Sequence, residues 1–320
     1  MLVQKILKDS FNIAKATMDA FFEDRVFKLS AALAYYTVLA ISPILMIIIS
    51  VASMLYKKDA IEDKIYSELN GLIGHDLAHE VQQFVINSSL TGKSDIALIT
   101  GLVVLFVAST AVFAEVQDSL NYIWQVKAKP KHGWLKIIRD RVLSFSVIVS
   151  LSFILLVSML LNTLIKRFGH FFLELFMEYD VTFDVLFFYI NKVVSILVTV
   201  AVFTLMFKVL PDVKLKWKHA LAGGIFTAIL FSIGQIGIGY YLQQFQPGLN
   251  FGSAGSIIAL LVWVYYTSII VYLGAEFTQV YAEKYGTGIQ PSEHAVYLKI
   301  IEQEKNVDVL PKQHPNETNE

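Results

Sequence analysis

Six long apolar segments, nearly free of charged residues, constrain this chain more than any other feature of its sequence. A helix needs about 20 apolar residues to cross the hydrocarbon core of a bilayer, which is about 30 Å thick, and each segment approaches or exceeds that length. Lipid-embedded backbone needs internal hydrogen bonds, and such continuous apolar runs exclude the alternating strands of a membrane barrel. The segments lie at residues 31–55, 96–113, 142–165, 185–207, 220–242 and 257–275.

The sequence therefore predicts an all-α, polytopic membrane protein with six transmembrane helices. Of its 320 residues, 55% are hydrophobic and only 17% are charged, compared with roughly 25% charged in soluble domains. We expect residues 1–287 to form the transmembrane domain and residues 288–320, which are mostly polar beyond Ile301, to form a largely disordered tail. Residues 56–95 show helical spacing of apolar residues and predict a helical outer loop.

Residues 5–29, before the first apolar segment, mix charged and apolar residues and predict an N-terminal amphipathic helix. Such a helix either lies on the inner membrane surface or packs under the helix bundle. The sequence leaves both arrangements open.

Lysine and arginine are distributed unevenly, which predicts the orientation of the chain. Nineteen of the 26 lie in the N-terminal segment, the loops after the second and fourth apolar segments, and the C-terminal tail, whereas six lie in the other loops and Lys192 lies within the fourth segment. Because cytoplasmic loops retain these residues, we expect a multi-pass membrane protein with both termini in the cytoplasm.

Polar and flexible residues within two apolar segments predict a substrate path. The first segment carries hydroxyl groups before a proline that is expected to kink its helix, and the fifth combines glycines with an amide at membrane depth. The candidate path residues are Tyr35, Tyr36, Ser42, Pro43, Gly234, Gln235 and Gly237. The fifth segment also repeats small residues every fourth position, from Ala220 to Ser232, which is typical of helix packing in membranes.

A second polar group is expected at the inner ends of the helices. Glu276 follows the sixth segment about 20 residues after Ile257, which at 1.5 Å per residue places it about 30 Å deeper, near the inner interface. The other members of this candidate inner polar cluster are Glu115, Asp118 and Lys208. They either form ion pairs that join helix ends or make a polar site open to the cytosol.

Catalytic and metal-binding patterns are sparse. His75 and His79 lie four residues apart, but no third ligand is evident, so solvated or interfacial roles are favoured. The chain has no cysteine and no nucleophile-elbow, phosphate-loop or zinc-protease motif. We therefore predict no catalytic residue, no metal and no cofactor.

Several segments resemble the YihY/BrkB family of bacterial inner-membrane proteins, historically labelled ribonuclease BN. They are "ALAYYTVLAISPILMI", "LNYIWQVK", "KVLPDVKLKWKHALAGG" and "FGSAGSIIALLVWVYYTSIIVYLGAEF", and the similarity covers about residues 20–285. The resemblance implies six transmembrane helices and an association with virulence and with envelope or lipid handling. It highlights, without assigning roles, Tyr35, Tyr36, Pro43, Asn121, Trp124, Pro211, Gly252, Ser253, Gly274, Ala275 and Glu276.

The leading hypothesis is a non-enzymatic transporter or flippase of a lipid or another amphipathic envelope molecule. Its partners would be membrane lipids and possible envelope proteins, with no nucleic acid. The alternative is a membrane scaffold for envelope assembly. The residues argue against the tRNA-processing label, because metal-dependent nucleases need clustered hard ligands and the basic loops already follow from membrane topology.

Overall fold

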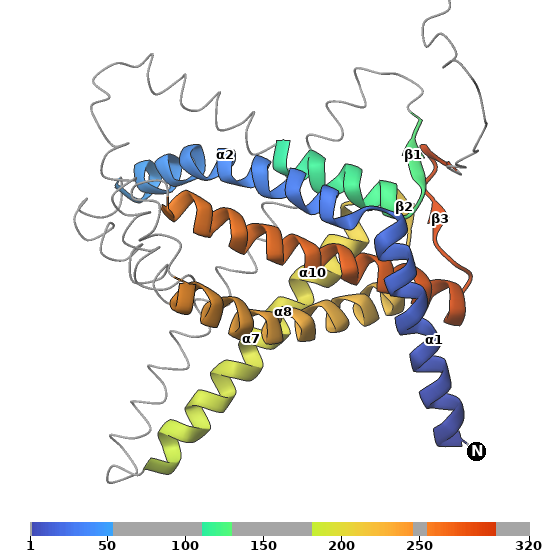
Figure 1. The fold of residues 1–320 in the computed structure, drawn as a ribbon, viewed down its shortest axis with the longest axis horizontal. Helices are drawn as coiled ribbons and strands as arrows, with labels where there is room; N and C mark the ends of the chain where they lie inside the picture. The colour runs from blue at the N-terminus through green and yellow to red at the C-terminus, as the bar shows by residue number, and fades with distance from the viewer. Residues whose placement is uncertain (1, 54–110, 130–180, 246–254, 299–320) are drawn as a thin grey trace, which may run out of the picture.

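The computed structural model of the protein describes residues 2–53, 111–129, 181–245 and 255–298. Helices account for most of these residues (Figure 1), as the predicted class requires. The helices are α1 (Leu2–Glu23), α2 (Val26–Ser53), an unlabelled helix at 111–123, α7 (Val181–Val209), α8 (Trp217–Phe245) and α10 (Gly255–Tyr285). The strands are β1 (Val126–Ala128), β2 (Val213–Lys214), β3 (Gln290–Pro291) and β4 (Ala295–Tyr297).

Three of the described helices are long and apolar enough to cross a membrane. They are Lys192–Val209 in α7, Trp217–Tyr241 in α8 and Leu260–Tyr285 in α10, and they coincide with the last three predicted segments. The first predicted segment lies largely on α2, which is apolar over Val26–Ala40, the part whose side chains the structure describes. The second and third predicted segments lie almost wholly outside the described residues, as does the outer loop, so the total of six stays a prediction.

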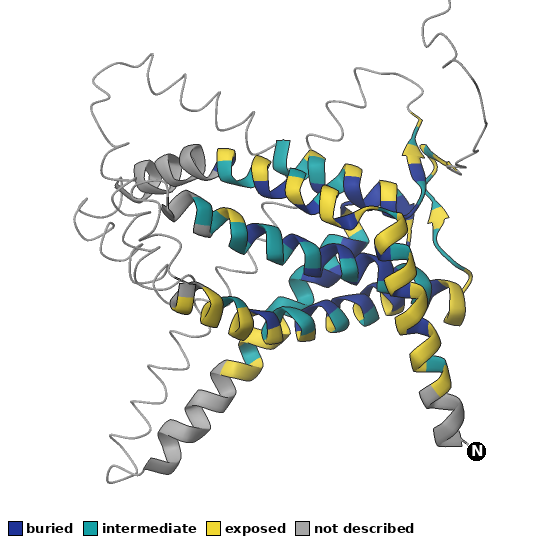
Figure 2. Ribbon diagram, in the orientation of Figure 1, coloured by how far each residue is buried: buried dark blue, intermediate teal, exposed yellow. Residues whose placement is uncertain are grey.

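Helix α10 lies at the centre of the arrangement. It packs along α2 on one side and along α8 on the other, and α8 packs in turn against α7 (Figure 1). Buried residues concentrate where these helices converge (Figure 2). We call this end the basic end, because Lys208, Lys214, Lys216, Lys218 and Lys284 lie at the ends of α7, α8 and α10 or in the segments that join them.

Two reciprocal glycine contacts bring α8 and α10 close together. A Cβ atom at Gly223 of α8 would collide with the side chain of Thr278 of α10, and a Cβ atom at Gly274 of α10 would collide with Thr227 of α8. Each threonine hydroxyl donates to a backbone carbonyl on its own helix, Thr227 to Gly223 at 2.8 Å and Thr278 to Gly274 at 2.6 Å. The threonines are therefore fixed and leave no room for a larger residue than glycine.

The small-residue stripe of α8 also packs closely against a neighbouring helix. Gly224 lies against Thr204 and the Val200 carbonyl of α7, and Ala220 and Ala228 are almost completely buried. The stripe is thus a packing surface, in keeping with the usual use of small residues where membrane helices meet.

Two short strand pairs tie distant loops together at the basic end. Strand β1 pairs antiparallel with β4, and β2 pairs antiparallel with β3. Further backbone bonds run from the Lys129 N–H to the His294 carbonyl and from the Leu298 N–H to the Gln125 carbonyl, each at 2.8 Å. The loop after the second predicted segment, the loop between α7 and α8, and the segment after α10 therefore form one ordered cap.

The cap includes the first part of the predicted tail. Residues 288–298 were expected to belong to a largely disordered tail, but they include β3 and β4. Their backbone groups are satisfied by strands that precede them in the sequence by many residues, which local composition cannot reveal. Residues 299–320 lie outside the described part of the chain.

Helix α1 combines features of both predicted arrangements. Ile13, Thr17 and Phe21 are buried, and α1 packs against α10, where the Lys284 ammonium lies 3.1 Å from an Asp9 carboxylate oxygen. On the opposite side, Phe11 is 70% exposed. The helix is therefore packed against the bundle and still presents apolar rings to its surroundings, as interfacial helices do.

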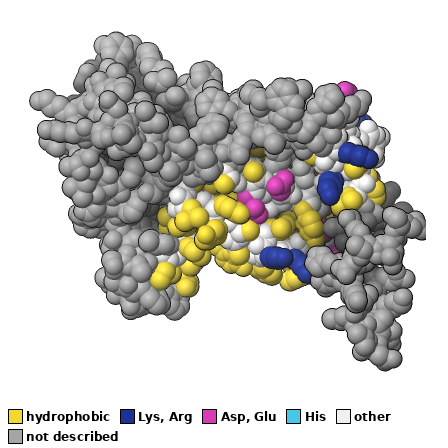
Figure 3. All heavy atoms as spheres, turned by 90° about the horizontal axis from the view of Figure 1, so that it is seen from above, with side chains coloured by type: hydrophobic (Ala, Val, Ile, Leu, Met, Phe, Trp, Pro, Cys, Tyr) yellow, Lys and Arg dark blue, Asp and Glu magenta, His cyan; other side chains and the backbone are white. Residues whose placement is uncertain are grey.

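Apolar side chains also form much of the outer surface. On the face in Figure 3, hydrophobic groups cover a broad area, and basic side chains gather toward the right, the side on which the β strands lie in Figure 1. Ile229, Ile233 and Ile236 of α8 are all more than half exposed. Exposed apolar patches of this kind mark a membrane-facing or partner-facing surface.

The close contact of α8 and α10 predicts a position-specific response to added volume. Gly274→Ala should lower the thermal stability of the purified protein, since overpacking typically costs about 1–3 kcal/mol. Gly239→Ala is the matched control, because no atom lies within 4 Å of a Cβ built there and alanine favours helix. Equal melting temperatures for the two variants would contradict the packing analysis.

Candidate functional site

Glu276 is the most unusual ionisable residue in the described part of the chain. Its side chain is 0% exposed, and neither carboxyl oxygen has a hydrogen-bond partner among the described residues. It lies one helical turn after the fully buried Tyr272 and directly after the buried Ala275, so the inward face of α10 carries it into the core. An isolated buried carboxylate is strongly unfavourable, which makes its nearest ionisable neighbour important.

That neighbour is Asp24, at the corner between α1 and α2. The chain turns there because Arg25 adopts a left-handed conformation with φ of 53°, and Phe21 and Val26 on either side are buried against the core. The Asp24 and Glu276 carboxyl groups are close enough to interact, although they form no well-aligned hydrogen bond. We call these two residues the carboxyl pair.

The surroundings of the pair disfavour a double negative charge. Burial raises the pKa of Asp24 from 3.8 to about 6; the interaction with Glu276 opposes this rise and the negative charge of Glu23 adds to it. Glu276 is fully buried and Asp24 is half-buried, so ionisation of both adjacent carboxyl groups is opposed by repulsion. These surroundings therefore favour a pair with no more than one negative charge.

The structure places Lys208 apart from Glu276, whereas Glu115 and Asp118 lie close enough to interact with each other. The Lys208 ammonium donates a hydrogen bond to the Leu215 carbonyl and lies 5.7 Å from the centre of the Trp217 ring, so it does not join Glu276. Glu115 accepts a hydrogen bond of 3.5 Å from Ser119, and Asp118 is exposed.

Asp24 was not among the site residues predicted from the sequence. It is an acid seven positions before the first apolar segment, whereas Glu276 is an acid immediately after the last. Both residues were expected near the inner interface, but nothing in the sequence showed that α1 and α2 would turn beside the end of α10.

Three residues that the family resemblance highlighted have clear structural roles. Asn121 fixes the turn between α7 and β2 through two hydrogen bonds. Its Nδ2 donates to Asp212 Oδ2 at 2.9 Å, and its Oδ1 accepts from the Asp212 N–H at 2.8 Å. Trp124 Nε1 donates to the Ala275 carbonyl at 3.1 Å, directly before Glu276. Pro211 is buried beside this turn.

Of the remaining highlighted positions, Gly274 is the close-packed residue described above. Gly252 and Ser253 lie outside the described residues. The highlighted residues that the structure describes, from Asn121 onward, thus connect three elements around Glu276. These are the helix at 111–123, the turn between α7 and β2, and the end of α10.

The structure does not bring the predicted path residues together. Tyr35 and Tyr36 are exposed on α2, and Gln235 is exposed on α8, but α10 lies between these two helices. A Cβ atom at Gly237 would meet open space, whereas Gly234 packs against Tyr266.

Ser42 and Pro43 also lie on α2, in a part whose side chains are outside the described set. None of the described path residues lines either of the cavities that α7, α8 and the adjoining segments form.

Metal-binding geometry is absent from the residues that the structure describes. No group of three or more histidine, aspartate, glutamate or cysteine side chains is placed there to hold an ion. His75 and His79 lie outside the described residues.

Comparisons with known proteins agree on one family. The sequence profile of the family described as "Virulence factor BrkB" matches residues 17–297. A "UPF0761 membrane protein" of Tolumonas auensis is 28% identical over 85% of this chain and 88% of its own length. Proteins of the same name from Vibrio vulnificus (28% identical, 82% of this chain and 79% of theirs) and Vibrio cholerae (27%, 82% and 84%) are also similar. No solved structure matches the chain.

The two hydrogen bonds between Asn121 and Asp212 predict that exchanging the two residue types restores stability. Asn121→Asp would place two carboxylates 2.9 Å apart and should destabilise the protein by about 1–3 kcal/mol through a lost hydrogen bond and like-charge repulsion. Adding Asp212→Asn restores one carboxylate and one amide at the same positions. The double variant should regain most of the lost melting temperature, and failure to do so would contradict the assigned geometry.

The raised pKa of Asp24 predicts the direction of a pH effect. The folded protein binds more protons than the unfolded chain between pH 3.8 and about 6, so this residue's contribution to stability falls as the pH rises through that interval and is constant above it. The expected loss is about 1 kcal/mol, after allowance for solvent screening of a half-buried group. Melting temperatures measured between pH 4 and 7.5 should therefore change less in Asp24→Asn than in the parent.

The exposed Asp19 on α1 provides the control for this measurement. Asp19→Asn removes the same charge without touching the carboxyl pair, and it should keep the pH dependence of the parent. An unchanged pH dependence in Asp24→Asn would show that this carboxyl does not titrate as described.

Proposed function

The chain belongs to the BrkB family of membrane proteins, and we propose that it moves a lipid or another amphipathic envelope molecule through its membrane. The carboxyl pair is the observation that supports this proposal. Ionisable residues at membrane helices are expensive to bury and typically mark substrate pathways or proton relays. The proposed movement uses no catalytic residue, metal or cofactor.

In the proposed mechanism, the proton held by the carboxyl pair controls the contact between the α1–α2 corner and α10. With one proton, the two carboxyl groups lie together and the corner stays packed. Loss of that proton creates repulsion at a buried contact, which favours separation of the corner from α10. Buried Phe21 and Val26 flank Asp24, so such a separation would expose apolar surface to a lipid-like molecule.

The exposed side chains suit a molecule that stays in contact with lipid. Tyr35 and Gln235 present polar groups on outward faces of α2 and α8, beside apolar surface. We place the movement along these faces rather than in a central channel, because α10 fills the space between α2 and α8.

We also propose that the protein resides in the bacterial inner membrane with its basic end in the cytoplasm. The lysines of the α7–α8 loop and the end of α10 are at one end of the bundle, and cytoplasmic loops are the ones enriched in such residues. Membrane lipids are its proposed partners in this setting.

A scaffold for envelope assembly is the second candidate. The observation that favours it is the apolar end of the cap, where Val296, Tyr297 and Leu298 are all at least 40% exposed on a short two-stranded ribbon. Exposed ribbon edges of this kind can receive a strand or peptide from another protein. A scaffold would be indifferent to the protonation of Glu276.

Transbilayer movement of labelled phospholipids in proteoliposomes tests the proposal. We expect movement above that of empty vesicles in the parent, and at least a tenfold slower rate in Glu276→Gln, because the amide cannot release a proton. Glu283→Gln is the matched control, since Glu283 is an exposed glutamate on the same helix, and it should behave like the parent.

Two results would contradict the proposal in different ways. Equal rates in the parent and Glu276→Gln would remove the carboxyl pair from the mechanism. No movement above empty vesicles, with several headgroups and an imposed proton gradient, would reject the transport function and favour the scaffold.

A further inference from the structure

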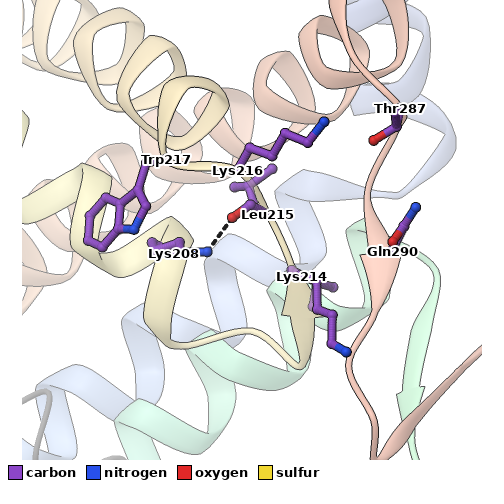
Figure 4. A pocket seen from close by; sticks show the side chains of 8 residues that line it. Lys208, Lys214, Leu215, Lys216, Trp217, Thr287 and Gln290 are labelled. Atoms are coloured by element: carbon purple, nitrogen blue, oxygen red, sulfur yellow. Dashed lines mark hydrogen bonds between the residues drawn. The ribbon is translucent and has the colours of Figure 1, made fainter.

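The loop between α7 and α8 forms a basic pocket of about 480 Å³ (Figure 4). Three lysines line it, Lys208 from the end of α7 and Lys214 and Lys216 from the loop, and Thr287 and Gln290 face them from the segment after α10. None of the lining residues is acidic. The pocket is therefore a site of positive potential with additional hydrogen-bonding groups.

The fold holds this pocket in shape. Pairing of β2 with β3 sets Lys214 opposite Gln290, and the bond from Lys208 to the Leu215 carbonyl fixes the near wall. Lys214 also lies 3.1 Å from a carboxylate oxygen of the exposed Glu293. Both side chains are more than half exposed, so solvent screens this ion pair and it offsets only part of the charge of Lys214.

An apolar groove of about 530 Å³ lies next to the basic pocket. Its walls are Leu197, Val200, Ala201, Thr204 and Leu205 of α7, and Trp217, Lys218 and Leu221 of α8. Trp217 lines both the groove and the basic pocket, so the two adjoin at this residue. From Leu205 to Leu197 the groove follows α7 for about 12 Å.

Membrane topology alone explains lysines at this end of the chain, but it does not explain their arrangement. The lysines surround a pocket that is completed by residues from a distant segment, and an apolar groove on helices long enough to cross a membrane leads away from it. A tryptophan at the junction is typical of the membrane interface. The basic pocket suits a negatively charged headgroup, and the apolar groove suits an acyl chain. Together they match one kind of ligand, an anionic lipid.

We propose that this pocket and groove bind an anionic phospholipid, with its phosphate between Lys208, Lys214 and Lys216 and an acyl chain along α7 and α8 below Trp217. Binding here does not depend on the proposed movement of a lipid or on the carboxyl pair, which lies at the α1–α2 corner and on α10. The site would hold lipid whether the protein acts as a transporter or as a scaffold.

Binding of short-chain phosphatidylglycerol and phosphatidylcholine to the detergent-purified protein, measured by calorimetry, tests this proposal. The parent should bind phosphatidylglycerol more tightly. The double variant Lys214→Gln/Lys216→Gln should weaken that binding about 30-fold, from the loss of two lysine contacts. Lys127→Gln/Lys129→Gln is the matched control, since it removes two exposed lysines from the same end of the molecule, and it should retain the affinity of the parent.

A groove variant distinguishes a lipid from a free phosphate. Ala201→Phe should fill the groove and weaken phosphatidylglycerol binding, while inorganic phosphate should compete only weakly in the parent because it has no acyl chain. Three results would overturn the proposal: equal affinity for the two lipids, equal weakening by the two lysine pairs, or unchanged lipid affinity in Ala201→Phe with strong competition by phosphate.

Discussion

The close packing of α10 between α2 and α8 is the constraint on which the rest of the structure depends. Glycines opposite buried threonines allow α8 and α10 to approach, and each threonine is fixed by a hydrogen bond to its own helix. This contact sets the rotation of α10. One helical turn beyond Tyr272, the same rotation directs Glu276 into the protein rather than toward lipid.

Around that glutamate, the polar residues at the end of the bundle mostly hold elements in place. Asn121 fixes the turn that contains Asp212, and Trp124 bonds to the carbonyl before Glu276. Their partners lie 91 and 151 residues away in the sequence. Neither carboxyl oxygen of Glu276 has a hydrogen-bond partner among the described residues, and a fully buried acid of this kind supports a functional interpretation of the carboxyl pair.

Apolar length allowed the sequence to predict the helices of the described spans, because the hydrocarbon thickness imposes a simple requirement. Apolar length could not predict which side chains contact one another. Glu276 and Lys208 were expected to belong to one cluster because their depths are similar, yet depth says nothing of rotation about a helix axis. Lys208 turns to the Leu215 carbonyl, and Glu276 faces Asp24, almost the whole length of the chain away. The strands β3 and β4 escaped prediction for the same reason, since their order comes from distant loops.

Infrared spectroscopy of the protein in lipid tests the central claim, that Asp24 and Glu276 share one proton, most directly. At pH 7 the parent should show a protonated-carboxyl band that is absent from Glu276→Gln and present in Glu283→Gln. A parent spectrum without such a band, or with one that Glu276→Gln leaves unchanged, would show that the pair holds no proton and would contradict the account.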